Sequence, residues 1–392
     1  MEGQPEEEPS ASAEDPASAA ESASTAEPVG SAADPFISSG DADEEEPQRS
    51  GWSRKRIIFT AAFGVIIVVF MYFLLFPQIS NYEDAADRIR NMAWEWVVAL
   101  VIAGVANIGL YSLTVNAAIR GLGYWRGFLE RQAGFMISNV IPGGGAVAVG
   151  TQASILNYYR VRPSMSAAAV AADAAYTYLF TLGMPALAVG LLATRQNTSG
   201  LLKATAIFGV ILFVVSLVGL LMILHSENGA RRIGRWGEKI AAPIWRRFKK
   251  PPPDLQTGLV NFRNDAHDLM RRRWVALAIT NVVAQLMPFV VLLCALGGLG
   301  AFPDSVDLLQ AFAAYSVAIL LVSFPITPGG LGTVDATLIA LLVSFGVDNA
   351  TAVAADLVWR LVWFLPQLVI GAICMGIFLV LRSRASKRAA KA

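Results

Sequence analysis

Charged residues are scarce in this sequence. Asp, Glu, Lys and Arg together make up only 16% of its 392 residues, whereas soluble domains carry about 25%. Hydrophobic residues account for 55% of the chain, and the mean hydropathy is positive at +0.52. So little charge cannot cover a water-facing surface. The composition therefore argues against a soluble protein and predicts an all-α integral membrane protein.

Cysteine and histidine are also nearly absent. The two cysteines, Cys294 and Cys374, both lie in apolar runs, which excludes a disulfide framework and favours buried, unreactive thiols. The two histidines, His225 and His267, have no cysteine near them in the sequence, so they do not make a convincing zinc ligand set. We therefore expect neither a metal site nor a cofactor.

The first 50 residues contain 14 Asp and Glu, one basic residue, Arg49, and almost no aromatic residue. Such a stretch cannot bury enough apolar surface to offset the entropy of ordering it, so residues 1–50 are predicted to form a disordered acidic tail. The rest of the chain holds 30 Lys and Arg against 16 Asp and Glu. Residues 51–385 are predicted to form one polytopic membrane domain, and residues 386–392 form a basic tail.

Two kinds of apolar stretch are found in the membrane domain. Six are long enough to cross a hydrocarbon core of about 30 Å. They are residues 57–76, 94–119, 164–193, 201–224, 274–296 and 350–381. Two further stretches, 128–156 and 308–345, are each interrupted by a turn rich in Pro and Gly and have short arms. Broken segments of this kind are predicted to be re-entrant hairpins.

Basic residues set the predicted orientation. Arg54, Lys55 and Arg56 precede the first span, and the loop 225–273 carries 12 Lys and Arg against five Asp and Glu. Because loops rich in Lys and Arg remain on the cytoplasmic side, we expect this loop and both termini to be cytoplasmic. The chain is predicted to be a multi-pass protein of the plasma membrane.

Two parts of the chain resemble each other. The sequence Pro-Gly-Gly at 142–144 is followed by Val-Ala-Ala-Asp at 170–173, and the same two motifs occur at 328–330 and 353–356. The predicted topology opens the two hairpins to opposite sides of the membrane. That pattern predicts an inverted repeat, as found in secondary transporters. The two repeats cover about residues 94–193 and 274–381.

The segment Thr327–Asp335, with the sequence TPGGLGTVD, resembles a known family. Together with Arg360 in the last span, it is similar to the second-repeat signature of the flippase-like membrane region of lysylphosphatidylglycerol synthases. The resemblance covers roughly residues 55–385 and implies the stand-alone form, without the aminoacyltransferase domain. We therefore expect a lipid translocase that is not an enzyme and does not aminoacylate lipid.

Two positions depart from the family pattern. The family usually has Glu where this chain has Asp335, and it carries an Arg in the first repeat near Tyr176 or Thr177, where this chain has none. These departures argue against identical charge chemistry in the two repeats.

The hairpin turns are candidate binding elements. A helix arm is expected to follow each turn, at about Ala146 and Leu331, and its free N–H groups would suit a lipid phosphate. The alternative is a tight turn in which glycine only permits the backbone path. The candidate turn residues are Pro142, Gly143, Gly144, Gly145, Pro328, Gly329, Gly330 and Gly332.

Four charged residues at membrane depth are further candidates. Arg360 is predicted to bind phosphate while Asp356, one helical turn earlier, holds it as an i,i+4 partner. Asp173 has no basic residue at i±3 or i±4, so it must find a partner across helices or stay protonated. Asp335 lies one turn into the second hairpin arm. Each of them could instead be structural, and the pair Glu130-Arg131 is interpreted as interfacial.

These features lead to a functional hypothesis. The chain is expected to move an anionic or aminoacylated phospholipid, or a lipid-linked precursor, between leaflets, with the headgroup in a cavity between the hairpins. The alternatives are a proton- or ion-coupled transporter of a small polar solute, and a scaffold for envelope lipid or glycan synthesis. The expected partners are membrane phospholipids and an envelope lipid-synthesis enzyme. No nucleic acid is expected to bind.

Overall fold

A computed structural model describes residues 82–141, 144–193, 226–247, 254–323 and 327–389, together with isolated positions between 207 and 222. The chain divides into two compact units, Met1–Pro35 and Phe36–Ala392. Every described residue belongs to the second unit. Several predicted features therefore lie outside the described residues. They are the acidic tail 1–50, the span 57–76, Pro142, Gly143 and most of the span 201–224.

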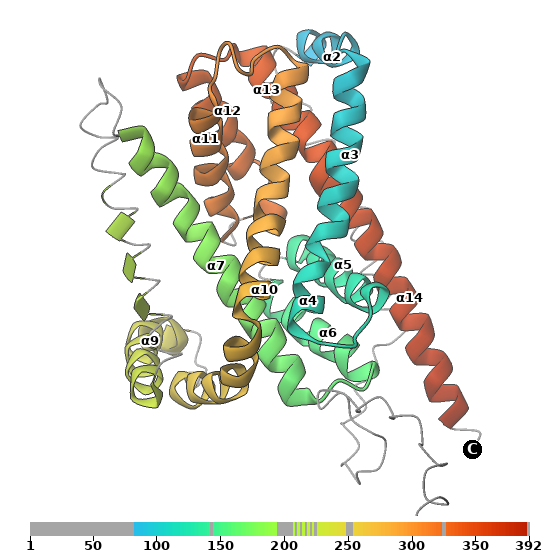
Figure 1. Cartoon of the computed structure of the whole chain (residues 1–392), viewed down its shortest axis with the longest axis vertical. Coiled ribbons are helices and arrows are strands. Elements are labelled where there is room, and N and C mark those ends of the chain that lie inside the picture. The colour runs from blue at the N-terminus through green and yellow to red at the C-terminus, as the bar shows by residue number, and fades with distance from the viewer. Residues whose placement is uncertain are drawn as a thin grey trace, which may run out of the picture. The chain divides into compact units, whose positions relative to one another are not determined.

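The described elements are helices (Figure 1), as the composition predicts. They are α2 (Tyr82–Arg90), α3 (Trp94–Tyr111), α4 (Leu113–Ala118), α5 (Tyr124–Val140), α6 (Gly145–Tyr158), α7 (Pro163–Ala193), α9 (Glu227–Arg247), α10 (Leu255–Gly298), α11 (Leu308–Leu320), α12 (Thr333–Ser344), α13 (Asn349–Trp359) and α14 (Leu365–Ala389). Short 3₁₀ turns lie at Leu321–Ser323 and Pro328–Gly330, and a π-helical segment lies at Arg360–Phe364.

Four helical segments among the described residues are long and apolar enough to cross a membrane. They are Trp94–Ala118, Pro163–Leu192, Arg273–Gly298 and Asn349–Arg388. Each matches a span predicted from the sequence. Apolar side chains such as Val101, Ile102 and Val105 are about 60% exposed or more on α3, as expected of a lipid-facing surface. A multi-pass α-helical membrane protein is therefore confirmed.

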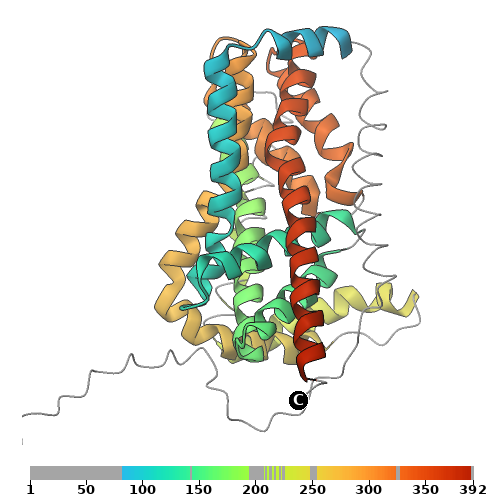
Figure 2. The same ribbon diagram turned by 90° about the vertical axis from the view of Figure 1, so that its right-hand side faces the viewer.

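The two predicted hairpins consist of helices too short to span a bilayer alone. α5 and α6 have 17 and 14 residues and pack against each other, and α11 and α12, with 13 and 12 residues, do the same. In Figure 1, α11 and α12 lie in the upper half of the view, at the same end of the long helices as α2. α5 and α6 lie in the lower half. α11 packs against α7, and α5 packs against α14, whose long path beside α5 is visible in Figure 2.

The turn of the second hairpin depends on glycine. Gly329, Gly330 and Gly332 have φ values of 60°, 68° and 80°, in the left-handed region that disfavours other residues. A Cβ atom at Gly329 would lie 2.5 Å from Cζ of Phe364. Position 329 therefore needs glycine for two reasons: the backbone has a positive φ, and Phe364 of the π-helical segment packs directly against it.

The last span changes its winding halfway along. Pro366 has no N–H to donate to the Val362 carbonyl, so a regular α-helical bond is missing there. The chain forms the π-helical segment Arg360–Phe364 between α13 and α14. Segments of this type are rare and frequently occur at functional sites. Here it contains both Arg360, at its start, and Trp363.

Candidate functional site

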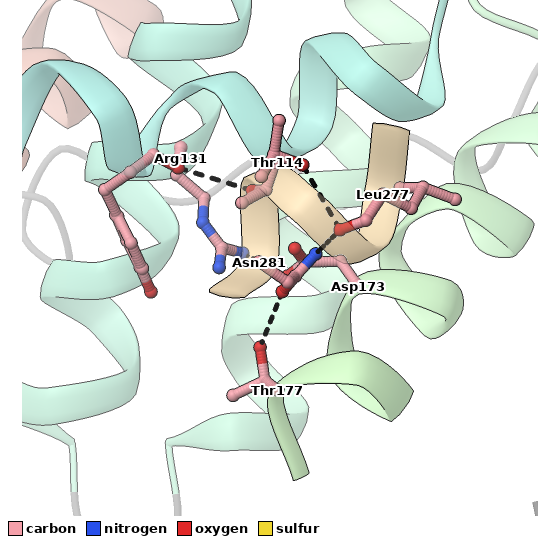
Figure 3. Close-up of polar contacts among 8 residues, drawn as sticks. Thr114, Arg131, Asp173, Thr177, Leu277 and Asn281 are labelled. Carbon is pink, nitrogen blue, oxygen red and sulfur yellow. Dashed lines mark hydrogen bonds and ion pairs between the residues drawn. The ribbon is translucent and has the colours of Figure 1, made fainter. Parts of the chain in front are cut away.

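The first charged cluster joins the first hairpin to the following span. Arg131 of α5 forms an ion pair with Asp173 of α7, and both residues are buried. The Arg131 guanidinium also lies over the Tyr111 ring, 4.2 Å from its centroid. Figure 3 shows Arg131 and Asp173 where α5, α7 and α10 meet, beside Thr177 and Asn281. Of the two alternatives left by the sequence, a partner from another helix or a retained proton, Asp173 has the partner.

The interfacial interpretation of Glu130 and Arg131 was wrong. α5 begins at Tyr124, earlier than the apolar run suggested, so these residues lie two turns inside the helix. Both are buried, with Glu130 only 1% exposed. Arg131 places a guanidinium beside Asp173, although no Arg lies near Tyr176 or Thr177, where the family pattern has one. The sequence signal was the unpaired Asp173, but it did not identify the partner.

Glu130 gives the first cluster a second carboxyl group. It lies within hydrogen-bonding reach of the Gln152 side chain and is acted on by the charges of Arg131 and Asp173. Its Oε2 atom has no hydrogen-bond partner. The first cluster therefore contains two buried carboxyls, of Glu130 and Asp173, and one guanidinium.

The second charged cluster joins the second hairpin to the last span. Nε of Arg360 donates to Oδ1 of Asp335 at 2.5 Å, and Nη1 donates to the Gly329 carbonyl at 3.3 Å. The guanidinium lies 5.2 Å from the ring centroid of Trp359 and 5.1 Å from that of Phe364. Arg360 and Asp335 are 2% and 3% exposed, so the pair is shielded from solvent.

The expectation that Asp356 is the partner of Arg360 was wrong. The ion pair of Arg360 goes to Asp335 on α12. Asp356 is buried, its Oδ1 atom has no hydrogen-bond partner, and its carboxyl lies within hydrogen-bonding reach of Asp335. The physical reason is that α12 packs against α13 and brings a carboxylate to the guanidinium from outside the helix. The second cluster, like the first, contains two carboxyls and one guanidinium.

The glycine-rich turns differ in what they can bind. Gly145 begins α6 and lines the cavity described below. At Gly144 an added Cβ would lie 2.4 Å from the Ile137 carbonyl oxygen, so this residue serves the tight turn. The N-terminus of α12 already has an acceptor, since Gly332 N–H donates to Oδ2 of Asp335 at 2.7 Å. Pro328 opens the 3₁₀ turn that presents the Gly329 carbonyl to Arg360.

A cavity of about 490 Å³ lies beside the first cluster. Its lining includes Arg131 and Asp173 and side chains from α3, α5, α6, α7, α10 and α11 and from the last span. Five of the residues that line it carry a buried N–H donor or carboxylate oxygen without a hydrogen-bond partner. These atoms are Nδ2 of Asn107, Nε of Arg131, Nε1 of Trp363, Nε2 of Gln367 and Oδ1 of Asp173. Unpaired buried donors are costly, so this set is suited to an anionic ligand.

The rim of the cavity is exposed and largely apolar. Val149 of α6, Tyr178 of α7 and Val322 of the turn after α11 line it and are 45%, 56% and 37% exposed. Tyr178 lies within the candidate membrane span Pro163–Leu192. No group of three or more His, Cys, Asp or Glu side chains in the described part of the chain is arranged to hold a metal ion.

Similarity to known proteins agrees with this architecture. Residues 56–371 match the family described as Lysylphosphatidylglycerol synthase TM region. The chain is also 24% identical over 321 residues to a "UPF0104 membrane protein" of Methanothermobacter thermautotrophicus, and the match covers 79% of this chain and 92% of that protein. The chain therefore belongs to the lysylphosphatidylglycerol synthase transmembrane-region family.

Proposed function

We propose that the chain is a lipid translocase of the plasma membrane, which moves an anionic or aminoacylated phospholipid, or a lipid-linked precursor, between leaflets. The observation that carries this proposal is the cavity beside Arg131 and Asp173, whose lining residues carry unpaired buried N–H donors and whose rim is apolar and exposed. Membership of a lipid-related membrane family agrees with it.

The polar lining of the cavity fits a lipid headgroup. The side-chain amide nitrogens of Asn107 and Gln367 and the indole nitrogen of Trp363 have no hydrogen-bond partner, and neither does Nε of Arg131. A phosphate is rich in acceptor oxygens and can satisfy several donors at once. The free Oδ1 of Asp173 can accept from an ammonium group when the headgroup carries one. A cavity of this size lies within the range of about 300–1,000 Å³ found for small-molecule sites.

The apolar rim fits the rest of a lipid. Exposed Val149, Tyr178 and Val322 border the cavity, so a headgroup can enter sideways from the bilayer while its acyl chains remain among lipid. A solute transporter needs a route to water instead, and a scaffold needs no cavity. These features favour the translocase over both alternatives.

We further propose the topology predicted from the sequence. It has six full spans and two re-entrant hairpins in an inverted repeat, with both termini cytoplasmic and no enzymatic activity. The two charged clusters support the repeat, because each joins one hairpin to the following span and contains two carboxyls and one guanidinium. The roles are exchanged between them: the first hairpin supplies Arg131, whereas the second supplies Asp335.

Reconstitution tests the translocase. Purified protein in liposomes should make fluorescent phosphatidylglycerol of the inner leaflet accessible to an impermeant quencher. Trp363→Phe, which removes the indole N–H donor but keeps an aromatic ring, should slow this movement. Trp236→Phe is the matched control, because Trp236 on α9 is 67% exposed and does not line the cavity. Folded wild-type protein that moves no lipid would contradict the proposed function.

A further inference from the structure

We propose that Asp356 binds an exchangeable proton, shared with Asp335, and that binding and release of this proton are coupled to lipid movement through the cavity. The proton site rests on the second charged cluster alone. The coupling to lipid rests on the proposed function.

The charge balance of the second cluster requires a proton. Both oxygens of Asp335 have donors, since Oδ1 accepts from Nε of Arg360 and Oδ2 accepts from Gly332 N–H. Asp335 is thus satisfied as a carboxylate and neutralises the guanidinium. Asp356 is a second carboxyl within hydrogen-bonding reach of Asp335. An ionised carboxylate only accepts hydrogen bonds, so a bond between the two groups needs a proton, and Asp356 is the group left to carry it.

In the described part of the chain, an ionised Asp356 has no positive neighbour besides Arg360, which already pairs with Asp335. Among the described residues, the charged groups that act on it are Asp335 and Arg360. α13 also packs against α2 and α10. From α2, Arg88 contacts Thr351 and Asp348, and from α10 the Pro288 carbonyl accepts from the Trp359 N–H. With Asp356 only 2% exposed, an ionised and unpaired carboxylate would be costly at this depth.

The first cluster also has two carboxyls and one guanidinium, but its hydrogen bonds do not need a bound proton. Its additional carboxyl, Glu130, lies within hydrogen-bonding reach of the Gln152 amide, and an amide can donate to an ionised carboxylate. Asp356 has a carboxyl as its neighbour instead. The second cluster is therefore the stronger proton site.

Release of the proton has a structural consequence. Nη2 of Arg360 is buried without a hydrogen-bond partner, and Asp356 lies four residues earlier, one turn along the same segment. An ionised Asp356 would attract the guanidinium away from Asp335. Arg360 thus has two alternative partners, and the protonation of Asp356 decides between them. A two-state element of this kind is what coupling requires.

The π-helical segment connects this switch to the cavity. Arg360 begins the segment, and Trp363, three residues later, lines the cavity with its unpaired indole N–H. The rings of Trp359 and Trp363 are 5.3 Å apart, and the Arg360 guanidinium lies over the Trp359 ring. Movement of Arg360 between the two carboxylates would therefore shift the ring that meets the headgroup.

Infrared spectroscopy tests the proton site without any transport assay. The purified full-length protein in lipid should show the C=O band of a protonated carboxylic acid, and the band should shift in deuterium oxide. Asp356→Asn should remove that band and still fold, because its amide can donate to Asp335 as the acid does. Asp348→Asn, an exposed carboxyl outside the cluster, should keep the band. An unchanged band in Asp356→Asn would overturn the proton site.

Transport under an imposed pH difference tests the coupling. A difference of about one pH unit is worth about 1.4 kcal/mol, or tenfold in an equilibrium, so wild-type lipid movement should change by up to about this factor. Asp356→Asn should lose the response and Asp348→Asn should keep it. Equal responses in wild type and Asp356→Asn would overturn the coupling. Wild-type protein that moves no lipid under either condition would overturn the proposed function and the coupling, while the infrared band still decides the proton site.

Discussion

Arg360 donates to Asp335, which lies 25 residues earlier in the sequence, rather than to Asp356, one turn before it. This pair links the second hairpin to the last membrane span. The Gly329 carbonyl accepts from the same guanidinium, so Arg360 holds both the turn of the hairpin and its second arm.

This pair predicts a non-additive stability effect. Removing one partner of a buried ion pair leaves an uncompensated charge and costs about 3–5 kcal/mol. Arg360→Met and Asp335→Leu should therefore each lower the thermal unfolding temperature in detergent, and the double variant should recover most of the loss. An Arg360→Met, Asp356→Leu double variant should recover less, because Asp356 is not the ion-pair partner. Equal recovery by the two double variants would contradict the assignment.

The cavity predicts that Arg131 cannot be replaced by lysine without loss. Arg131→Lys keeps the positive charge beside Asp173 but lacks the planar fork that contacts the carboxylate and a phosphate together. We expect a folded protein whose lipid movement is reduced by about tenfold or more, equivalent to about 1.4 kcal/mol. Arg120→Lys, at an exposed position, is the control and should be as active as wild type. Full activity of Arg131→Lys would leave Arg131 with a structural role only.

The conformation of the second hairpin turn predicts that Gly329→Ala strongly destabilises the protein. Alanine there combines an unfavourable φ of 60° with a contact of 2.5 Å to Phe364, and we expect a loss of about 2 kcal/mol or more. Gly376→Ala is the control, since nothing lies within 4 Å of a Cβ atom at that α14 position. Thermal unfolding of the two variants side by side is the measurement. Similar stability in both would show that the turn tolerates a side chain.

Asp348, which precedes α13, is predicted to make a pH-dependent contribution to the stability of the folded protein. Burial opposes ionisation of Asp348, but hydrogen bonds from Thr351 and the charge of Arg88 outweigh it and hold the pKa below its ordinary value of 3.8. The stabilisation is therefore complete above about pH 4 and is lost as the pH falls through the lowered pKa. Asp348→Ala, which removes the helix cap, should cost about 1 kcal/mol at neutral pH. The difference from wild type should shrink in acid, as thermal unfolding at several pH values would reveal.

The proposed orientation predicts labelling by an impermeant thiol reagent in intact cells. In a background without Cys294 and Cys374, a cysteine at Asp304 should be labelled, because this exposed position lies in the loop between α10 and α11. Cysteines at Lys239 and Lys387 should be protected until the cells are permeabilised. Labelling of Lys239→Cys from outside would reverse the topology.

The sequence by itself determined the protein class and its main segments. The lengths of the apolar runs predicted the four described spans, and the Pro-Gly interruptions predicted the short paired helices α5–α6 and α11–α12. These features are readable because the bilayer imposes a minimum apolar length and demands that backbone groups be satisfied locally. The isolation of Asp173 from any basic residue on its own helix face left either a partner from another helix or a retained proton, and Arg131 is that partner.

Only the tertiary structure decided which charges meet. Arg131 and Asp173 are 42 residues apart and Arg360 and Asp335 are 25 apart, and both pairs depend on how one helix is rotated and packed against another. Spacing along a helix reveals the neighbours on its own face, which is why Asp356 was mistaken for the partner of Arg360. In an apolar interior a guanidinium binds the carboxylate that packing brings to it, whatever the distance along the chain.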